Sequence, residues 1–290
     1  MLKHWLLASR PKTLVASLLP VVAGFLLAYE QAPNVSKVTG ILCLLYCLLI
    51  QIGTNFANDY FDFLKGADER RENAPRRMVS SGLISPKIMF LGTCLVFLLS
   101  FMVGIYIMES VQGSRFLLVV GIASILFGFG YTGGPFPLAY NGLGDLFVVL
   151  FFGFVAVLTT QYVVILSTNS DWQPNWILPL GVGFVINNLL VVNNYRDYEE
   201  DKKVGKRTLL VLLGRPTGLV LFSSGVLIST LLIPFLVPSA WPTIFLLPIG
   251  IYAFLKLRKS LCENDFSNIL LLCAVEVFLY TLLLMLGYLI

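Results

Sequence analysis

Two short polar segments interrupt an apolar chain, and each combines carboxylates, amides and cations. The first spans residues 58–71 (NDYFDFLKGADERR) and the second spans residues 193–207 (NNYRDYEEDKKVGKR). Nine of the 16 acidic residues lie in or beside these segments: Asp59, Asp62, Asp68, Glu69, Glu72, Asp197, Glu199, Glu200 and Asp201. This concentration makes the two segments the candidate functional sites.

The side chains in both segments favour a hard metal ion bound together with a phosphate-bearing substrate. Carboxylate and amide oxygens suit Mg²⁺, which usually bridges a few carboxylates to substrate phosphates. The single histidine, His4, lies at a terminus and the five cysteines form no CxxC pair, so a histidine-based metal site or catalytic triad is excluded. We therefore expect Mg²⁺ to be bound, and the predicted metal ligands and catalytic residues are Asp59, Asp62, Asp197 and Asp201.

Basic residues follow each acidic cluster at the distance of a short loop. Guanidinium and ammonium groups there would bind phosphate oxygens by charge-assisted hydrogen bonds. The prediction for this role is Arg77, Lys206 and Arg207. The competing interpretation is that these cations only anchor the chain at a membrane surface, as cytoplasmic loops of membrane proteins commonly do.

The composition indicates an integral membrane protein. The chain is 57% hydrophobic and 12% charged, whereas roughly a quarter of residues are charged in soluble domains. The sequence predicts an all-α, polytopic protein with one domain, residues 1–290, and about nine transmembrane helices in a bundle. The nine apolar runs are 14–29, 38–58, 87–108, 115–132, 145–166, 175–197, 217–236, 241–256 and 267–289. The eighth run is short and flanked by proline, so eight spans remain an alternative.

The distribution of lysine and arginine predicts the orientation. With a cytoplasmic N-terminus, 18 of the 20 basic residues fall in inner segments, and only Lys37 and Arg115 fall in outer loops. Cytoplasmic loops of membrane proteins are enriched in these residues. We expect a multi-pass protein of the cell inner (cytoplasmic) membrane with both acidic clusters at the cytoplasmic face. The net charge of +4 follows from this topology, and no nucleic-acid partner is implied.

The two polar segments share a spacing. Asn55-xxx-Asp59 and Asn193-xxx-Asp197 close the second and sixth predicted spans, which suggests a four-helix unit that is repeated and followed by a ninth helix. At about 100° per residue, polar residues of each span fall on one stripe of roughly 100–120° if the helix continues through the motif. These stripes are Gln51, Asn55, Asn58, Asp59 and Asp62, and then Asn187, Asn193, Asn194, Asp197 and Asp201. The alternative, two solvated helix ends, does not account for asparagines one or two turns deeper.

At these residues the chain resembles the UbiA-type superfamily of membrane prenyltransferases. The first motif of that family is Asn-Asp-x-x-Asp-x-x-x-Asp, and Asn58, Asp59 and Asp62 match it. Glycine occupies position 66, where the third aspartate is expected, and Asp68 follows two residues later. The second motif is Asp-x-x-x-Asp, which residues 197–201 match. The displaced aspartate, together with residues 9–13 (SRPKT), 131–145 (YTGGPFPLAYNGLGD) and 205–208 (GKRT), resembles the 1,4-dihydroxy-2-naphthoate polyprenyltransferase branch.

The resemblance implies transfer of a polyprenyl group from its diphosphate to an aromatic acid, within a central cavity that dissolves the isoprenoid chain in the bilayer. In the naphthoate branch the acceptor loses its carboxylate as carbon dioxide and becomes demethylmenaquinol. The substrate-binding residues then expected are Asn55, Asn58, Asp68, Arg77, Asn193, Asn194, Lys206, Arg207, Tyr131 and Arg10. Tyr131, with Tyr140 and Tyr162, would stabilise an allylic cation, although an interfacial aromatic belt also accounts for these residues. Arg10 would meet the acceptor anion, although anchoring at the membrane surface also explains it.

Three other functions stay open at this point. One is prenyl transfer to another aromatic acceptor, such as 4-hydroxybenzoate or homogentisate. Another is cation-coupled transport, although coupling sites in transporters lie near the membrane midplane on broken helices. The third is non-catalytic binding of a lipid diphosphate.

Overall fold

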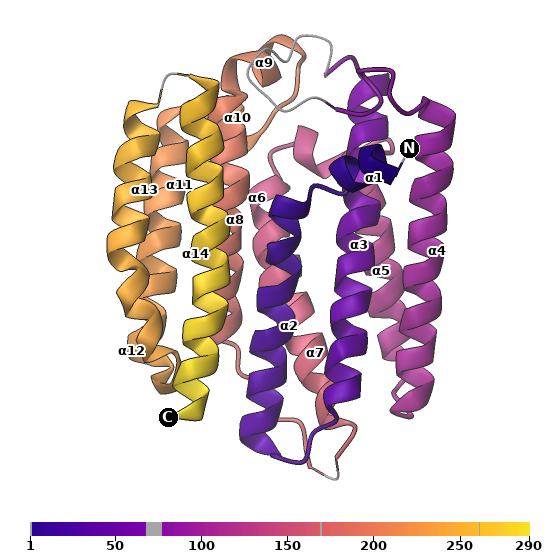
Figure 1. Ribbon diagram of the computed structural model, residues 1–290, viewed down its shortest axis with the longest axis vertical. Helices are drawn as coiled ribbons and strands as arrows, with labels where there is room; N and C mark the ends of the chain where they lie inside the picture. Colours follow the sequence, from indigo (N-terminus) through magenta and orange to yellow (C-terminus); the bar gives the residue numbers. More distant parts are fainter. Residues whose placement is uncertain (1, 68–76, 169, 261) are drawn as a thin grey trace.

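The structure is a computed structural model that describes residues 2–67, 77–168, 170–260 and 262–290. Secondary structure in this part of the chain is helical, apart from one isolated bridge between Asn141 and Arg207. The helices run side by side between two ends of the molecule (Figure 1). In chain order they are α1 (Leu2–Ala8), α2 (Pro11–Gln31), α3 (Lys37–Leu64), α4 (Pro86–Ser110), α5 (Phe116–Gly130), η1 (Leu138–Tyr140), α6 (Gly144–Val148), η2 (Val149–Val155), α7 (Ala156–Ile165), α8 (Leu178–Arg196), α9 (Tyr198–Lys203), α10 (Leu209–Leu213), α11 (Pro216–Leu227), η3 (Ile228–Leu232), α12 (Ile233–Leu236), η4 (Pro238–Leu246), α13 (Leu247–Lys259) and α14 (Glu263–Leu289).

The predicted all-α, polytopic membrane architecture is confirmed. Within the described residues, eight helical segments are long and apolar enough to cross a membrane. The predicted eighth run is one of them, Pro238–Lys259, whereas the predicted fourth run becomes α5, which has only 15 residues. At 1.5 Å per residue, α5 rises about 22 Å, less than a typical hydrocarbon core of about 30 Å. The run that is too short to cross a membrane is therefore α5, whereas the proline-flanked eighth run is long enough.

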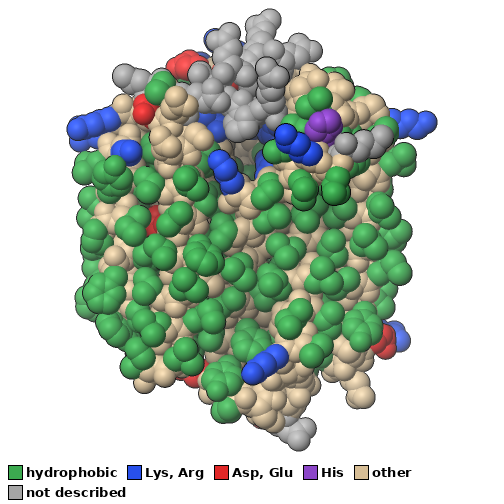
Figure 2. Space-filling view, viewed as in Figure 1, with side chains coloured by type: hydrophobic (Ala, Val, Ile, Leu, Met, Phe, Trp, Pro, Cys, Tyr) green, Lys and Arg blue, Asp and Glu red, His purple; other side chains and the backbone are tan. Residues whose placement is uncertain are grey.

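The outer surface matches a lipid environment around the middle and water at the ends. Large apolar side chains such as Leu95, Leu126 and Phe235 are more than half exposed. Figure 2 shows hydrophobic side chains covering the middle of this face, with most of its lysines and arginines gathered at one end. Figure 1 places the N-terminus and α9 at that same end and the C-terminus at the other. The chain is thus a multi-pass membrane protein whose two ends differ in charge.

Small residues bring the central helices together. A β-carbon at Gly183 of α8 would lie 2.8 Å from the Val149 carbonyl oxygen, and one at Gly153 of η2 would lie 2.5 Å from the Pro179 carbonyl oxygen. Glycine at these contacts lets the two backbones touch, as is common between membrane helices. The largest buried cluster joins α2 and α8 to α11, α13 and α14. This packing fixes α8, which carries the second motif, against the rest of the bundle.

The two motif helices end differently. Helix α3 continues to Leu64, so the predicted polar stripe through Asp62 lies on one continuous helix, as expected. Helix α8 ends at Arg196, and Asp197 (φ −85°, ψ 6°) separates it from α9. The expectation that one helix continues through Asp201 is therefore wrong, because the backbone leaves the helical region at Asp197. Asp201 still follows one turn later, and its amide donates to the Asp197 carbonyl at 2.7 Å.

Candidate active site

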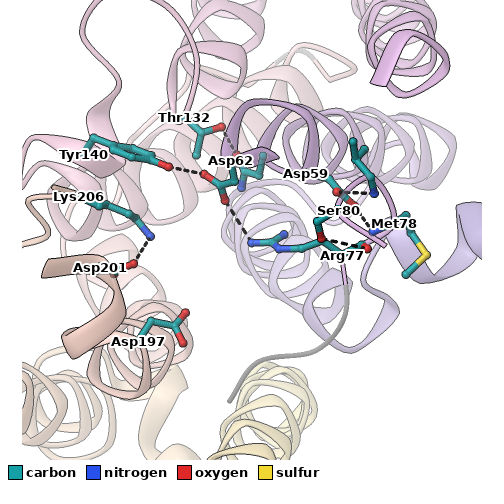
Figure 3. A network of polar contacts seen from close by, with 12 residues as sticks. Asp59, Asp62, Arg77, Met78, Ser80, Thr132, Tyr140, Asp197, Asp201 and Lys206 are labelled. Atoms are coloured by element: carbon teal, nitrogen blue, oxygen red, sulfur yellow. Dashed lines mark hydrogen bonds and ion pairs between the residues drawn. The ribbon is translucent and has the colours of Figure 1, made fainter. Parts of the chain in front are cut away.

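The four predicted metal-binding aspartates lie at the same end of the bundle, in two pairs from different elements (Figure 3). Asp59 and Asp62 come from α3, and Asp197 and Asp201 flank the start of α9. Each is at most 3% exposed. A buried carboxylate is costly unless it is hydrogen-bonded or paired with a cation, so the partners of these groups define the site.

The first pair is held by groups that come from outside α3. Both oxygens of Asp59 accept backbone hydrogen bonds, from the amides of Met78 at 3.0 Å and Val79 at 3.1 Å. Asp62 accepts a hydrogen bond of 2.8 Å from the Tyr140 hydroxyl, and its other oxygen lies 3.3 Å from an Arg77 nitrogen. Asp59 thus anchors the chain that enters α4, while Asp62 is joined to a cation and to a distant loop.

The second pair is held by cations from its own segment. Arg196 makes a two-point contact with Asp197, with nitrogen–oxygen distances of 2.6 and 2.9 Å. Lys206 lies 3.2 Å from Asp201 and is itself only 8% exposed. Asp62, Asp197 and Asp201 are therefore each paired with a cation: Arg77, Arg196 and Lys206. Each of these cations could leave its carboxylate and bind an anionic ligand instead.

One loop between α5 and α6 connects the two motifs. The ammonium of Lys65 lies 4.1 Å from the centre of the Tyr140 ring and that of Lys206 lies 5.7 Å from it, so both are within cation–π range. Lys65 also donates to the Thr132 carbonyl, and the Thr132 hydroxyl donates to Asn58 at 2.8 Å. The pKa of Lys65 is lowered from its usual value, mainly because the ammonium is partly buried. The nearby Asp62 carboxylate opposes this shift, and the Lys206 ammonium adds to it. The loop thus brings two basic groups to one aromatic ring between the aspartate pairs.

A cavity of about 290 Å³ lies among α2, α3, α4, α5, α6, η2, α7 and α8. Its wall is largely apolar and includes Phe127, Phe147 and Phe151, whose ring centres are 5.1–5.9 Å apart. Polar groups gather at the end nearest the aspartates: Arg10, Asn55, Asn58, Tyr131 and Asn193. Along α3 the lining runs from Asn58 to Cys43, a helical rise of about 22 Å. The shape suits a molecule with a polar head at the aspartates and a long apolar tail.

The donor chemistry of the aspartate end fits Mg²⁺. The four carboxylates and the neighbouring asparagine amides are oxygen donors of the class that this ion prefers. In the part of the chain that the structure describes, no cluster of three or more His, Cys, Asp or Glu side chains could hold an ion by itself. The carboxylates come instead as two separate pairs, so an ion there would complete its shell with oxygens of a ligand or of water. This fits an ion that binds together with a phosphorylated substrate.

The structure brings together most of the predicted substrate-binding residues. Arg10, Asn55, Asn58, Tyr131 and Asn193 line the cavity. Arg77 and Lys206 contact the predicted aspartates directly.

Four predicted residues stand apart from this arrangement. Asn194 is buried but is not among the described residues that line the cavity. Arg207 is exposed, and it contributes a backbone amide that donates to the Tyr140 carbonyl at 3.2 Å. Tyr162 packs on Trp172 with a ring separation of 5.1 Å, also away from the described cavity lining. Asp68 lies outside the described residues.

Sequence reasoning named Tyr140 only as a ring that could stabilise a cation, and it did not predict the contacts that Lys65, Thr132 and Tyr140 make between the motifs. Their roles depend on contacts between segments about 70 residues apart, such as Thr132 with Asn58. The available signal was the motif of residues 131–145, which contains Tyr140 and Thr132 and which resembles a prenyltransferase branch.

Comparison with known proteins supports the same assignment of fold and family. Residues 17–282 match the UbiA prenyltransferase family. A 1,4-dihydroxy-2-naphthoate octaprenyltransferase of Haemophilus influenzae is 37% identical over 225 residues, which cover 76% of this chain and 72% of the relative. A UbiA prenyltransferase domain-containing protein 1 homolog of Drosophila melanogaster is 31% identical, covering 77% of this chain and 61% of the relative. A UbiA homolog from Archaeoglobus fulgidus, solved bound to GPP and Mg²⁺, has the same fold, with a TM-score of 0.64 at 17% identity over 99% of this chain and 100% of that one.

Proposed function

The chain belongs to the UbiA prenyltransferase family, and on that premise we propose that it transfers a polyprenyl group from polyprenyl diphosphate to 1,4-dihydroxy-2-naphthoate. Carbon dioxide and diphosphate would be released, and demethylmenaquinol would be the product. The observation that carries the proposal is the position of two buried aspartate pairs at the polar end of a long apolar cavity. The choice of acceptor is supported by the relative from H. influenzae and by the motifs of residues 66–68 and 131–145.

The aspartates and the cations beside them would bind the diphosphate. We assign Asp59, Asp62, Asp197 and Asp201 to hold Mg²⁺, which when bound acts as a Lewis acid toward the departing diphosphate. Arg77, Lys206 and Lys65 would turn from their present partners to phosphate oxygens, because a diphosphate offers more charge than one carboxylate. Asn58 would contact the same head group from α3.

The cavity would hold the isoprenoid tail and protect the reacting carbon. The bond between the allylic carbon and the diphosphate oxygen breaks, and the oxygen keeps the electron pair. The electron-poor carbon must then meet the aromatic ring before it meets water. The apolar wall around Phe127, Phe147 and Phe151 would exclude water from this position, and aromatic faces would stabilise a nearby cation.

A second candidate function is prenyl transfer to a different aromatic acceptor. The similarity to the protein from D. melanogaster shows that relatives carrying a different name match this chain at comparable identity. Transport is disfavoured, because Asp59 and Asp62 lie in the last turns of α3 and Asp197 and Asp201 lie at α9, which is at one end of the bundle (Figure 1) rather than at its middle. We assign this end to the cytoplasmic face on the distribution of basic residues.

The test is an assay of the purified protein with farnesyl diphosphate and each aromatic acid in turn. We expect a prenylated product from 1,4-dihydroxy-2-naphthoate that requires Mg²⁺ and disappears with EDTA. Formation of product from 4-hydroxybenzoate but not from the naphthoate would overturn the choice of acceptor.

The metal assignment is tested separately by an isosteric substitution. Asp197→Asn should abolish Mg²⁺-dependent diphosphate release. Glu199→Gln, two residues away and exposed, should not. Equal turnover in the two variants would contradict the assignment.

The orientation in the membrane is tested by labelling. A membrane-impermeant maleimide should label the exposed Cys262 in inverted vesicles and not in intact cells.

A further inference from the structure

A polar pair lies beside the cavity and is not part of the diphosphate site. Asp145, in the first turn of α6, accepts a hydrogen bond of 3.1 Å from the side-chain amide of Asn187 in α8. Both are buried, at 6% and 2% exposure. Within the described residues, the second oxygen of Asp145 and the side-chain oxygen of Asn187 have no hydrogen-bond partner. Buried polar groups with unused acceptors in a membrane helix bundle are costly and point to a function.

Asp145 and Asn187 are not among the described residues that line the cavity, but each lies close along its helix to residues that do. Asp145 lies one helical turn before Val148, and Phe147 and Val148 both line the cavity. Asn187 lies on α8 next to Ile186, another lining residue. The unused acceptors therefore lie beside the apolar wall, about three turns from Asp197 along α8.

Tyr131 lies close to this pair and in the cavity wall. Its side chain lines the cavity, and its hydroxyl oxygen would be 3.1 Å from a β-carbon at Gly144, the residue before Asp145. The hydroxyl lies in the electrostatic field of Asp145, of the motif aspartate Asp62 and of Arg10. Arg10 also lines the cavity. Tyr131 thus lies against the residue before Asp145 and shares the cavity lining with a cation, Arg10.

We propose that Tyr131 binds a ring hydroxyl of the aromatic acceptor and that Asp145, held by Asn187, is the residue that orients Tyr131 for this contact. The assignment rests on the proposed function, whose acceptor site it locates. Among the described residues the second oxygen of Asp145 has no hydrogen-bond partner; when the acceptor occupies the cavity, the Tyr131 hydroxyl turns and donates to it, because an ionised acceptor makes the stronger bond. The oxygen of Tyr131 then presents its lone pairs to the cavity, and it selects a ligand that donates. Arg10 meets the carboxylate of the same acceptor, so the site takes a hydroxylated aromatic acid.

Tyr131→Phe is the main test, because it removes one hydroxyl and keeps the ring. In the wild type, 1,4-dihydroxy-2-naphthoate should bind up to about tenfold more tightly than the analogue that lacks the contacted hydroxyl, which is the size expected of one hydrogen bond. The analogues to compare are 1-hydroxy-2-naphthoate and 4-hydroxy-2-naphthoate. Tyr131→Phe should lose this preference and raise the acceptor KM by about the same factor. The KM for farnesyl diphosphate should not change. Tyr106→Phe, on the exposed face of α4, is the matched control.

Asp145→Asn tests the orienting role. It should raise the acceptor KM in the same direction, with no further effect when combined with Tyr131→Phe, because both changes remove one contact. Equilibrium binding of the naphthoate without a prenyl donor gives a measurement that does not depend on turnover.

An unchanged preference for the hydroxylated naphthoate in a folded Tyr131→Phe variant would overturn the inference. If the wild type binds the naphthoate with this preference but transfers no prenyl group to it, the proposed function fails and the acceptor site stands.

Discussion

The Tyr140 hydroxyl donates a hydrogen bond of 2.8 Å to Asp62, across 78 positions of sequence. The ring of the same tyrosine receives the ammonium of Lys65, which follows the first motif, and that of Lys206, which follows the second. Its carbonyl accepts from the Arg207 amide. Tyr140 therefore connects the two motifs, so that the carboxylates and cations from both can act on one head group.

The first prediction concerns this connection. Tyr140→Phe keeps the ring contacts and removes the bond to Asp62, which as a hydrogen bond to a charged group is worth roughly 1.5–3 kcal/mol. We expect the Mg²⁺ concentration that gives half-maximal diphosphate release to rise roughly ten- to hundredfold, because Asp62 loses the group that orients it. Tyr106→Phe serves as the control for loss of a tyrosine hydroxyl. An unchanged Mg²⁺ dependence would show that Asp62 is oriented by other contacts.

A second prediction separates a phosphate-binding cation from a membrane anchor. Lys206 is buried beside Asp201, whereas Lys202 is exposed. Lys206→Met should weaken inhibition by inorganic diphosphate at least tenfold, and Lys202→Met should leave it within about twofold, because exposed charges are screened. Inhibition constants measured on the two variants check this. If both lysines matter equally, the effect comes from the general positive charge of this end.

Cavity depth should limit the length of the prenyl chain. Gly121 of α5 lines the cavity, and a β-carbon there would meet only the Tyr46 hydroxyl, at 3.4 Å. Gly121→Leu should therefore fill the apolar part of the cavity without disturbing the backbone. We expect kcat/KM to fall at least tenfold for long prenyl diphosphates and to change little for geranyl diphosphate. Val119→Leu, on the exposed side of α5, is the control. A uniform loss with all chain lengths would place the tail elsewhere.

Close helix contacts should control the stability of the bundle. Gly183→Ala places a methyl group 2.8 Å from the Val149 carbonyl and should cost roughly 1–3 kcal/mol of unfolding free energy, because neither backbone can move freely. Gly130→Ala meets no atom of the described residues within 4 Å and should be neutral or slightly stabilising. Thermal unfolding of the two variants in detergent measures the difference. Equal Tm values would mean that α8 and η2 can separate without loss of stability.

The sequence by itself determined the class of fold and named the candidate residues of the site. Long apolar runs require backbone hydrogen bonds to be made within each segment, so helices follow from composition. Asp59 and Asp62 lie within one turn on a continuous helix, so their common face followed from local geometry. The oxygen-only donor set indicated the kind of ion before any contact was known.

Only the tertiary structure decided which groups meet. The end of α8 at Arg196, the exposure of Arg207 and the position of Tyr162 depend on how segments pack, which helical periodicity does not encode. The same holds for the contacts of Tyr140 with Asp62 and of Asp145 with Asn187, which join residues 78 and 42 positions apart. Such long-range pairs form because the whole bundle must bury its helices against one another, and the energy that selects one arrangement is shared across many contacts. The motifs therefore named the candidate groups, and the packing placed Tyr140 between them and a cavity beneath them.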